Sequence, residues 1–354
     1  MKPAAKGDNA GMIPPGIRKL VQQAKTQRAT DIHICAGSPI LFRVGKDLVP
    51  ASQGVVTPDL SERLSFEMLT PAQIEQFHAQ LDYDLMISDE GGRYRVNISY
   101  NDRAVGAVIR ILPEEARSLE ELGLPPVVKE LASLTKGLVL ITGSTSQGKS
   151  ATMSGIIKEI NTHQRRHIVT IEDPIENVHL NKRGVVRQRE VGRDTKTFYS
   201  GLRAALRQDP NVIAIGEMRD YETIKTALTA AETGVLVLST LHVISIDKMI
   251  ERLLSYAPAE DQDHMRYLLA AALQAVIHQE LLPTLDGGKR VACEVLIATD
   301  AVKNVLRRRD SFLLRNVVHT GARFGMITMR QSVEDLLQKG LVAPEVAESI
   351  LANY

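Results

Sequence analysis

Hydrophobic positions repeat with two different periods along this chain. Over residues 17–24 they recur every three or four residues, which predicts a helix with one buried face. Over residues 94–100 apolar and polar residues alternate, and a second run follows at 103–112, beyond a turn at Asn101-Asp102. This alternation predicts an antiparallel hairpin with one buried face, and Arg95 lies on its polar face.

The pattern of the strands changes from residue 138 onward. Four runs are apolar throughout, at 138–142, 168–171, 212–215 and 235–241, with helical segments between them. Strands that are apolar on both faces predict a parallel sheet covered by helices on both sides, the α/β class. After the sheet we expect a long amphipathic helix at about 260–282, a strand at 291–298 and several short helices.

The two patterns indicate two domains. A chain of 354 residues exceeds the usual size of one hydrophobic core. Proline and charged residues at 113–118 interrupt both patterns and predict a linker. We therefore expect a flexible tail at 1–15, a smaller α+β domain at 16–112 and an α/β domain at 119–354.

Charge and cysteine content exclude some classes of function. Forty-three basic and 42 acidic residues leave a net charge of +1, without the cationic excess that dominates non-specific nucleic-acid affinity, so we expect no nucleic-acid partner. Cys35 and Cys293 are too far apart for a zinc knuckle or a disulfide scaffold, which predicts no zinc and fits a reducing cytosol. We interpret both as small buried hydrophobes.

A phosphate-binding motif joins the first apolar strand to the helix that follows. It reads Gly143-Ser144-Thr145-Ser146-Gln147-Gly148-Lys149-Ser150, with Ala151 next in the helix. Such a loop wraps phosphate oxygens with backbone N–H groups at a helix N-terminus. Lys149 would reach the β- and γ-phosphates of ATP, and the Ser150 hydroxyl would bind Mg²⁺. The alternative is a chance glycine-rich turn. From average residue frequencies, however, this pattern should arise by accident in only ~1% of chains this long.

Polar residues follow three other strands of the predicted sheet. Carboxyl ends of parallel strands meet at one edge, where an ATPase positions its attacking water. Glu217 is our choice for the base that orients this water, with Glu172 and Asp173 near the metal. His242 has two open interpretations: it is a structural histidine, or it senses the γ-phosphate or relays a hydrogen bond there. Without the phosphate loop, each acid would be read as a solvated strand end.

Several motifs, in this order and spacing, resemble those of one family. They are Thr170 to Glu176, Gly216 to Asp220 and Thr240 to His242, similar to the aspartate box, Walker B and histidine box of the PilT-type twitching-motility ATPases, in the secretion-ATPase superfamily. The resemblance extends over nearly the whole chain. It implies a PAS-like N-terminal domain, a RecA-like ATPase domain and a homohexamer with ATP between neighbouring units.

The resemblance also implies arginines that reach the phosphates. Arg95 and Arg110 match those that the N-terminal domain offers on closure, and Arg203 and Arg207 match a pair before the Walker B strand. Arg203 and Arg207 lie four apart in a helical run, 198–207, and hence on one face. Without the resemblance, a solvated basic surface would be the simpler interpretation of all four.

Two features favour pilus retraction over extension. Extension ATPases commonly carry a four-cysteine zinc element, which two distant cysteines cannot build. Residues 301–307 are similar to the A-I-R-N-L-I-R segment implicated in retraction. The resemblance therefore implies a cytoplasmic motor, peripherally associated with the inner membrane at the pilus base, that acts on a platform protein. The alternatives are a weakly hydrolysing auxiliary ring beside a paralogous retraction ATPase, or a RecA-type nucleic-acid translocase.

The chain departs from the family's usual loop, G-P-T-G-S-G-K-[ST], at Ser144, Ser146 and Gln147. If the family's glycine at position 146 uses a positive φ, Ser146 is strained there. Asn211 and Val243 also replace the usual Asp and Thr beside two other motifs. These departures leave room for a slow ATPase.

Overall fold

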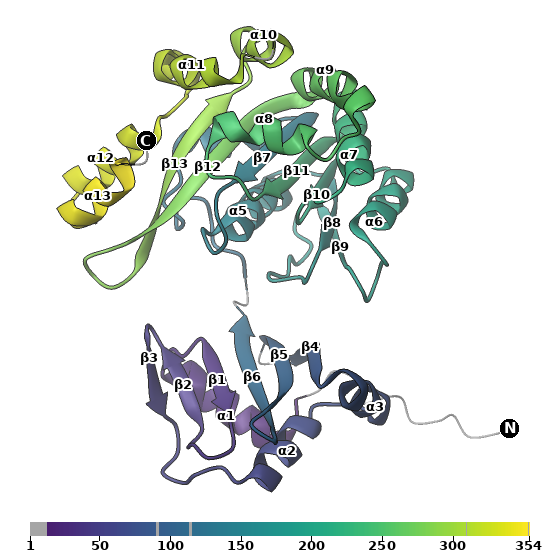
Figure 1. Cartoon of the computed structure of the whole chain (residues 1–354), viewed down its shortest axis with the longest axis vertical. Coiled ribbons are helices and arrows are strands. Elements are labelled where there is room, and N and C mark those ends of the chain that lie inside the picture. Colours follow the sequence, from purple (N-terminus) through teal and green to yellow (C-terminus); the bar gives the residue numbers. More distant parts are fainter. Residues whose placement is uncertain (1–12, 90–91, 113–114, 309, 353) are drawn as a thin grey trace, which may run out of the picture. The chain divides into compact units, whose positions relative to one another are not determined.

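The structure is a computed structural model that describes residues 13–89, 92–112, 115–308, 310–352 and 354. The chain divides into two compact units, residues 1–114 and 115–354, each with its own sheet (Figure 1). Among the described helices, none combines the length and the apolar content needed to cross a membrane. Residues 1–12 of the predicted tail lie outside the described residues, and the first helix begins within that tail, at Pro15.

The first unit is a six-stranded antiparallel sheet in the order β3-β2-β1-β6-β5-β4. Its elements are α1 (Pro15–Thr26), β1 (Asp31–Ile34), β2 (Leu41–Val44), β3 (Asp47–Pro50), α2 (Pro58–Phe66), α3 (Pro71–Gln80), β4 (Asp82–Asp89), β5 (Gly92–Asn101) and β6 (Ala104–Leu112). Each of these helices begins with a proline, which is suited to the first turn. The predicted helix and hairpin are both confirmed as α1 and β5-β6.

The second unit is built on a seven-stranded sheet in the order β13-β12-β7-β11-β10-β8-β9, parallel except for β13. Its strands are β7 (Gly137–Thr142), β8 (His167–Glu172), β9 (Val185–Glu190), β10 (Val212–Ile215), β11 (Leu236–Leu241), β12 (Leu273–Pro283) and β13 (Lys289–Ile297). Its helices are α4 (Pro126–Leu131), α5 (Lys149–His163), α6 (Phe198–Ala205), α7 (Tyr221–Thr233), α8 (Ile246–Leu254), α9 (Gln262–Ala272), α10 (Asp300–Arg308), α11 (Leu314–Thr320), α12 (Met329–Gln338) and α13 (Pro344–Leu351).

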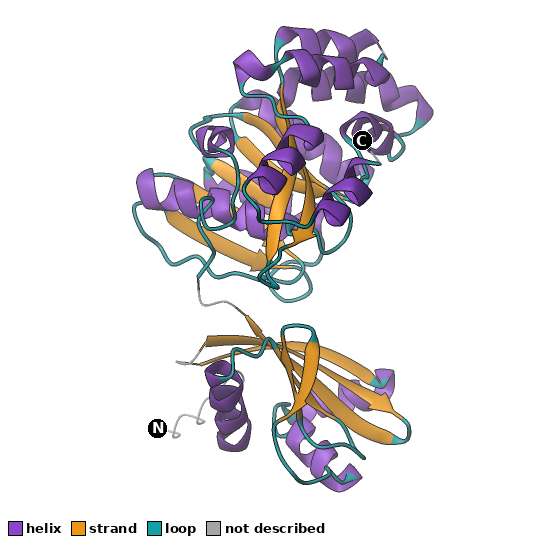
Figure 2. Cartoon of the chain, turned by 90° about the vertical axis from the view of Figure 1, so that its left-hand side faces the viewer, coloured by secondary structure: helices purple, strands orange, loops and turns teal. Residues whose placement is uncertain are grey.

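Both faces of this sheet are covered by helices, as the continuous apolar strands predict (Figure 2). Successive side chains of β7 point to opposite faces of the sheet. Leu138 and Leu140 join a core with α6, α7, α8 and α9, whereas Val139 and Ile141 join a core with α4 and α5. The helix that follows the phosphate loop, α5, therefore packs on the opposite face from most of the others.

The predicted helix at 260–282 is wrong. The helix α9 ends at Ala272, and the chain continues as β12, which pairs with both β7 and β13. Periodicity cannot distinguish a buried strand from a buried helix over a short apolar run. Here the run forms a strand because it pairs with the edge of β7. The β-branched Val276 and Ile277 fit the resulting strand.

Two smaller expectations also fail. Cys35 is exposed, so only Cys293 is the small buried hydrophobe that we expected. The helical run predicted at 198–207 is an α-helix only to Ala205, and a 3₁₀ turn (Leu206–Gln208) follows it. A single turn of tighter helix is common at a helix end, and composition does not reveal it.

Candidate functional site

The phosphate-binding motif lies between the end of β7 and the start of α5. Gly143, Ser146 and Gly148 have φ values of +145°, +65° and +81°. A Cβ on Gly143 would lie 2.5 Å from the Gln279 carbonyl oxygen, so only glycine fits there. Ser146 takes the left-handed conformation that costs a residue with a side chain about 1 kcal/mol or more, as its replacement of the family glycine suggested.

The loop is also fastened to β12, which extends beyond the end of β7. The Gln147 side-chain Oε1 accepts a hydrogen bond from the Leu281 N–H, at 2.5 Å, and the Gln147 carbonyl accepts one from Gln279 Nε2, also at 2.5 Å. At the base of the loop, Thr142 Oγ1 lies 3.0 Å from Nδ1 of the buried His278. The loop therefore has a fixed support along one side.

Lys149 turns its ammonium group inward, and the residue is only 6% exposed. Its Nζ donates to the carbonyl oxygens of Gly143, at 2.9 Å, and Ser144, at 2.6 Å, and lies 3.2 Å from His242 Nδ1. Burial lowers the pKa of Lys149, and the Glu217 charge opposes that shift. The ammonium group thus occupies the centre of the loop, where phosphate oxygens would offer stronger acceptors than carbonyls.

Glu217 follows β10 and makes two polar contacts. Its Oε2 lies 2.7 Å from Arg219 Nη2 and 3.4 Å from His242 Nε2. The Arg219 side chain is 62% exposed, whereas that of Glu217 is 16% exposed. The contact with Glu217 raises the pKa of Arg219 further. The carboxylate is therefore held between a histidine on the neighbouring strand end and an arginine that is open to solvent.

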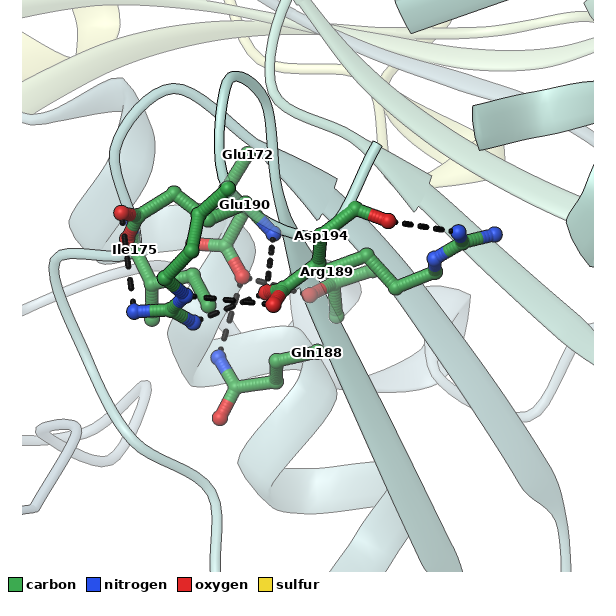
Figure 3. A network of polar contacts seen from close by, with 8 residues as sticks. Glu172, Ile175, Gln188, Arg189, Glu190 and Asp194 are labelled. Carbon is green, nitrogen blue, oxygen red and sulfur yellow. Dashed lines mark hydrogen bonds and ion pairs between the residues drawn. The ribbon is translucent and has the colours of Figure 1, made fainter. Parts of the chain in front are cut away.

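Glu172, at the end of β8, is a buried carboxylate. Its Oε1 accepts hydrogen bonds from Thr170 Oγ1, at 2.5 Å, and from Gln188 Nε2, at 3.0 Å. Figure 3 shows this carboxylate within a network of polar contacts along β9. Two hydrogen bonds to one oxygen fix the orientation of this buried side chain.

These groups surround one cavity of about 430 Å³. The residues that line it are Thr145, Ser146, Gln147, Gly148, Lys149, Ser150, Ala151, Met153, Glu172, Asp173, Pro174, Glu176, Phe198, Gly216, Glu217, Arg219, Thr240, His242 and Leu281. The structure thus brings together the predicted loop, the three predicted acids and His242. Gly143 and Ser144 begin the loop without lining the cavity.

The predicted arginines are not among the residues that line this cavity. Arg203 and Arg207 are exposed; Arg207 Nη1 donates to the Arg203 carbonyl oxygen, and the Arg203 guanidinium lies 5.7 Å from the Tyr199 ring. Arg95 and Arg110 belong to the first unit, where they face each other across β5 and β6. Each has an acidic partner in its own sheet.

Arg110 has the closer of these two partners. Its Nε lies 2.7 Å from Asp31 Oδ1, whereas Arg95 Nη2 lies 3.7 Å from Asp84 Oδ2. Burial pushes the pKa of Asp31 up, but hydrogen bonds from Thr30 and Arg110 outweigh it and hold that pKa below its usual value. A function for either arginine at a phosphate would require it to leave its acid.

The sequence interpretation assigns no role to Arg219, Phe198, Thr240 or Gln188. Arg219 lies two residues after Glu217, within a motif that we used only for its glutamate. Thr240 likewise belongs to a motif that we used only for His242. Phe198 and Gln188 carry no local signal, because their position at the cavity or beside Glu172 depends on how the strands are ordered.

The oxygen groups beside the loop suit Mg²⁺. Ser150, Glu172 and Asp173 line the same cavity, and hydroxyl and carboxylate oxygens are the ligands that this ion prefers in proteins. Mg²⁺ bound with ATP keeps several waters, so two or three such groups suffice. Within the described ranges, no three His, Cys, Asp or Glu side chains gather into a metal-binding cluster.

Comparison with known proteins extends the argument from the site to the whole chain. The family model of type II/IV secretion system proteins matches residues 6–338. The type IV pilus retraction ATPase PilT of Pseudomonas aeruginosa is 40% identical over 332 residues, which cover 94% of this chain and 96% of PilT. The type IV pilus ATPase PilU of the same bacterium is 34% identical over 331 residues, covering 93% of this chain and 87% of PilU.

A solved structure of a pilus retraction motor is also similar to this chain. The crystal structure of the pilus retraction motor PilT with bound ADP matches with a TM-score of 0.86 at 38% identity, over 94% of this chain and 95% of that one. The resemblance drawn from the motifs and the α/β, RecA-like fold of the second unit are thereby confirmed. The chain belongs to the type II/IV secretion system protein family and is an ATPase of its PilT type.

Proposed function

We propose that this chain is a hexameric motor that couples hydrolysis of Mg²⁺-bound ATP to retraction of type IV pili and so to twitching motility. One observation carries the chemical half of this proposal. Lys149, Glu217 and His242 follow three different strands and lie in contact at one cavity. The kinship to PilT supports the mechanical half.

Phosphate binding is the first step. On arrival of ATP, the Lys149 ammonium exchanges the Gly143 and Ser144 carbonyls for β- and γ-phosphate oxygens, which are charged acceptors. The N–H groups at the start of α5 face the same phosphates. Ser150 and Asp173 would hold Mg²⁺, with Glu172 near its waters, and the bound ion would supply positive charge beside the phosphates.

Hydrolysis is the second step. Glu217 orients a water for in-line attack on the γ-phosphate. For this its carboxylate must turn from Arg219, which competes for the same oxygen at 2.7 Å. His242 lies within reach of both Glu217 and Lys149, which suits a group that senses the γ-phosphate.

Movement is the third step. In the proposed ring, residues 16–112 form the PAS-like domain, 113–118 the linker and 119–354 the ATPase domain. Domain closure brings Arg95 and Arg110 to the phosphates, and Arg203 and Arg207 complete the site between neighbouring units. Because binding, hydrolysis and release favour different arrangements, the cycle displaces an inner-membrane platform protein. The ring works in the cytoplasm, at the membrane surface.

Glu217→Gln and Lys149→Ala test the proposal together. Glu217→Gln removes the carboxylate but keeps its shape, so we expect ATP turnover to fall about 10²–10³-fold with Mg²⁺-ATP binding retained. Lys149→Ala should lose both turnover and binding. Steady-state ATPase assays and nucleotide titrations on assembled rings measure this. Wild-type turnover in Glu217→Gln hexamers contradicts the proposal.

A second candidate is an auxiliary ring that hydrolyses ATP weakly and assists a paralogous retraction ATPase. The strained Ser146 and the kinship to PilU favour it. Turnover of the wild type close to that of Lys149→Ala would select it. In cells, excess pili without movement after deletion of the gene would select the principal motor instead.

A further inference from the structure

The chain that follows β8 forms one wall of the nucleotide cavity, through Asp173, Pro174 and Glu176. It then runs beside the edge strand β9, where side chains of β9 bond its backbone. Glu190 Oε2 accepts from the Ile175 N–H, at 3.1 Å, and Gln188 Oε1 accepts from the His179 N–H, at 2.8 Å. Two side chains of one strand thus hold this wall.

Gln188 makes a further pair of contacts. Its Nε2 donates to the Asn177 carbonyl oxygen, at 2.8 Å, and to Glu172 Oε1, at 3.0 Å. Figure 3 shows Gln188 and Glu172 on neighbouring strands with a dashed contact between them. One amide thus joins the buried carboxylate to the backbone of the cavity wall, with both donors and its acceptor in use.

The chemistry of an amide is needed for this arrangement. A carboxylate at position 188 could accept from His179 but could donate neither to Glu172 nor to Asn177. An aliphatic side chain could neither accept a hydrogen bond from His179 nor donate one to Glu172 or Asn177. Glutamine also carries no charge, so it orients Glu172 without adding another anion beside it.

We propose that Gln188 is a positioning residue for ATP hydrolysis, which holds Glu172 and the 173–179 wall in the geometry that orders Mg²⁺ and its waters. This inference rests on the proposed ATPase function. Gln188 is not among the residues that line the cavity, so it acts through Glu172 and the wall and not on the nucleotide itself.

Gln188→Glu gives the most specific test, through the pH dependence of turnover. Two carboxyl groups about 3 Å apart share one proton at low pH, and the protonated carboxyl group introduced at position 188 then donates to Glu172 as the amide did. At higher pH both ionise and repel each other. Turnover relative to wild type at the same pH should therefore fall by about tenfold or more as the pH rises through the pKa of this pair.

Two further variants distinguish the positioning role of Gln188 from the effect of an added charge and from damage to the fold. Gln188→Met lacks the hydrogen bonds at every pH, so kcat should fall about tenfold at every pH while KM for ATP changes less. Gln164→Glu makes the same chemical change at the far end of α5, where the amide bonds only the Ala132 carbonyl in the described structure. Its pH profile should match wild type.

The measurements are kcat and KM between pH 5.5 and 9 on full-length rings, with thermal unfolding alongside. The inference is overturned if Gln188→Glu and Gln188→Met both keep kcat within about twofold of wild type, or if Gln188→Glu loses activity equally at every pH. A wild type without turnover would instead sink the proposed function. Gln188 would then be judged by the Mg²⁺ concentration needed for ATP binding, which should rise in Gln188→Met and stays unchanged if the inference is wrong.

Discussion

The two sheets of this chain present their charged residues in different ways. In the second unit, Lys149, Glu217 and His242 all follow strand ends, although up to 93 residues separate them in sequence. In the first unit, Arg95 and Arg110 lie within strands, face each other across the hairpin and are paired with acids of the same sheet.

This difference follows from strand direction. Parallel strands joined by helices bring all their carboxyl ends to one edge, so a site forms there from loops alone. Antiparallel strands alternate in direction, and their polar residues spread over an open face. The second unit therefore assembles a cavity by its topology. In the first unit the two arginines are paired with acids, so an effect on a phosphate would require each arginine to leave its acid.

The largest expected effect tests whether Arg110 acts on the phosphates. Arg110→Ala should lower ATP turnover of assembled rings roughly 10²–10³-fold, because an arginine that stabilises a transferring phosphoryl group has effects of this size or larger. Mg²⁺-ATP binding to the second unit should persist. Steady-state assays and nucleotide titrations on the same preparation measure the two.

Asp31→Asn is the matched control for Arg110→Ala, since it removes the same ion pair of 2.7 Å but keeps the arginine. We expect it to retain turnover. Equal losses in the two variants would mean that Arg110 serves only the first unit's own stability, and the comparison between the two sheets would then lose its functional meaning.

The next largest effect concerns the stability of the second unit at low pH, which we expect to depend on His278. This side chain is fully buried between Thr142 and Tyr354, and burial lowers its pKa to about 4 from 6.5. A histidine with a depressed folded pKa stabilises the fold above its unfolded pKa and loses that contribution as the pH falls. At pH 5 the free energy of unfolding should therefore be about 2 kcal/mol lower than at neutral pH through this group alone.

His278→Gln keeps a hydrogen-bonding side chain but cannot titrate in this range. Its free energy of unfolding should therefore fall less than that of wild type between pH 7.5 and pH 5. Urea denaturation followed by signals from each unit measures this. An identical pH dependence in both proteins would show that His278 is not responsible.

The smallest effect is expected for Asp84, the partner of Arg95. Their atoms are 3.7 Å apart and both side chains are well exposed, so solvent screens the pair. Asp84→Asn should change the free energy of unfolding of the first unit by less than about 0.5 kcal/mol. A change above about 1 kcal/mol, measured by denaturation at low and high salt, would give this open face a structural role that the geometry does not suggest.

Local pattern was enough for many of the elements and for the centre of the site. Alternation predicted the hairpin that carries Arg95 and Arg110, and continuous apolar runs predicted β7, β8, β10 and β11. The phosphate loop was recognisable because its glycines and Lys149 act within eight consecutive residues. Pattern failed at β12, since the run from Leu273 onward suits either a helix or a strand until the edge of β7 is known.

The sequence by itself was enough to predict a loop for phosphate and a strand-end acid for water, and to identify an ATPase family. Only the tertiary structure decided which distant residues contact that loop and the acids beside it. Gln147 reaches β12 some 134 residues later, and Gln188 on β9 reaches Glu172 at the end of the neighbouring strand β8. Such contacts leave no periodic signal, because they depend on the order of strands in the sheet and not on the neighbours of each residue along the chain.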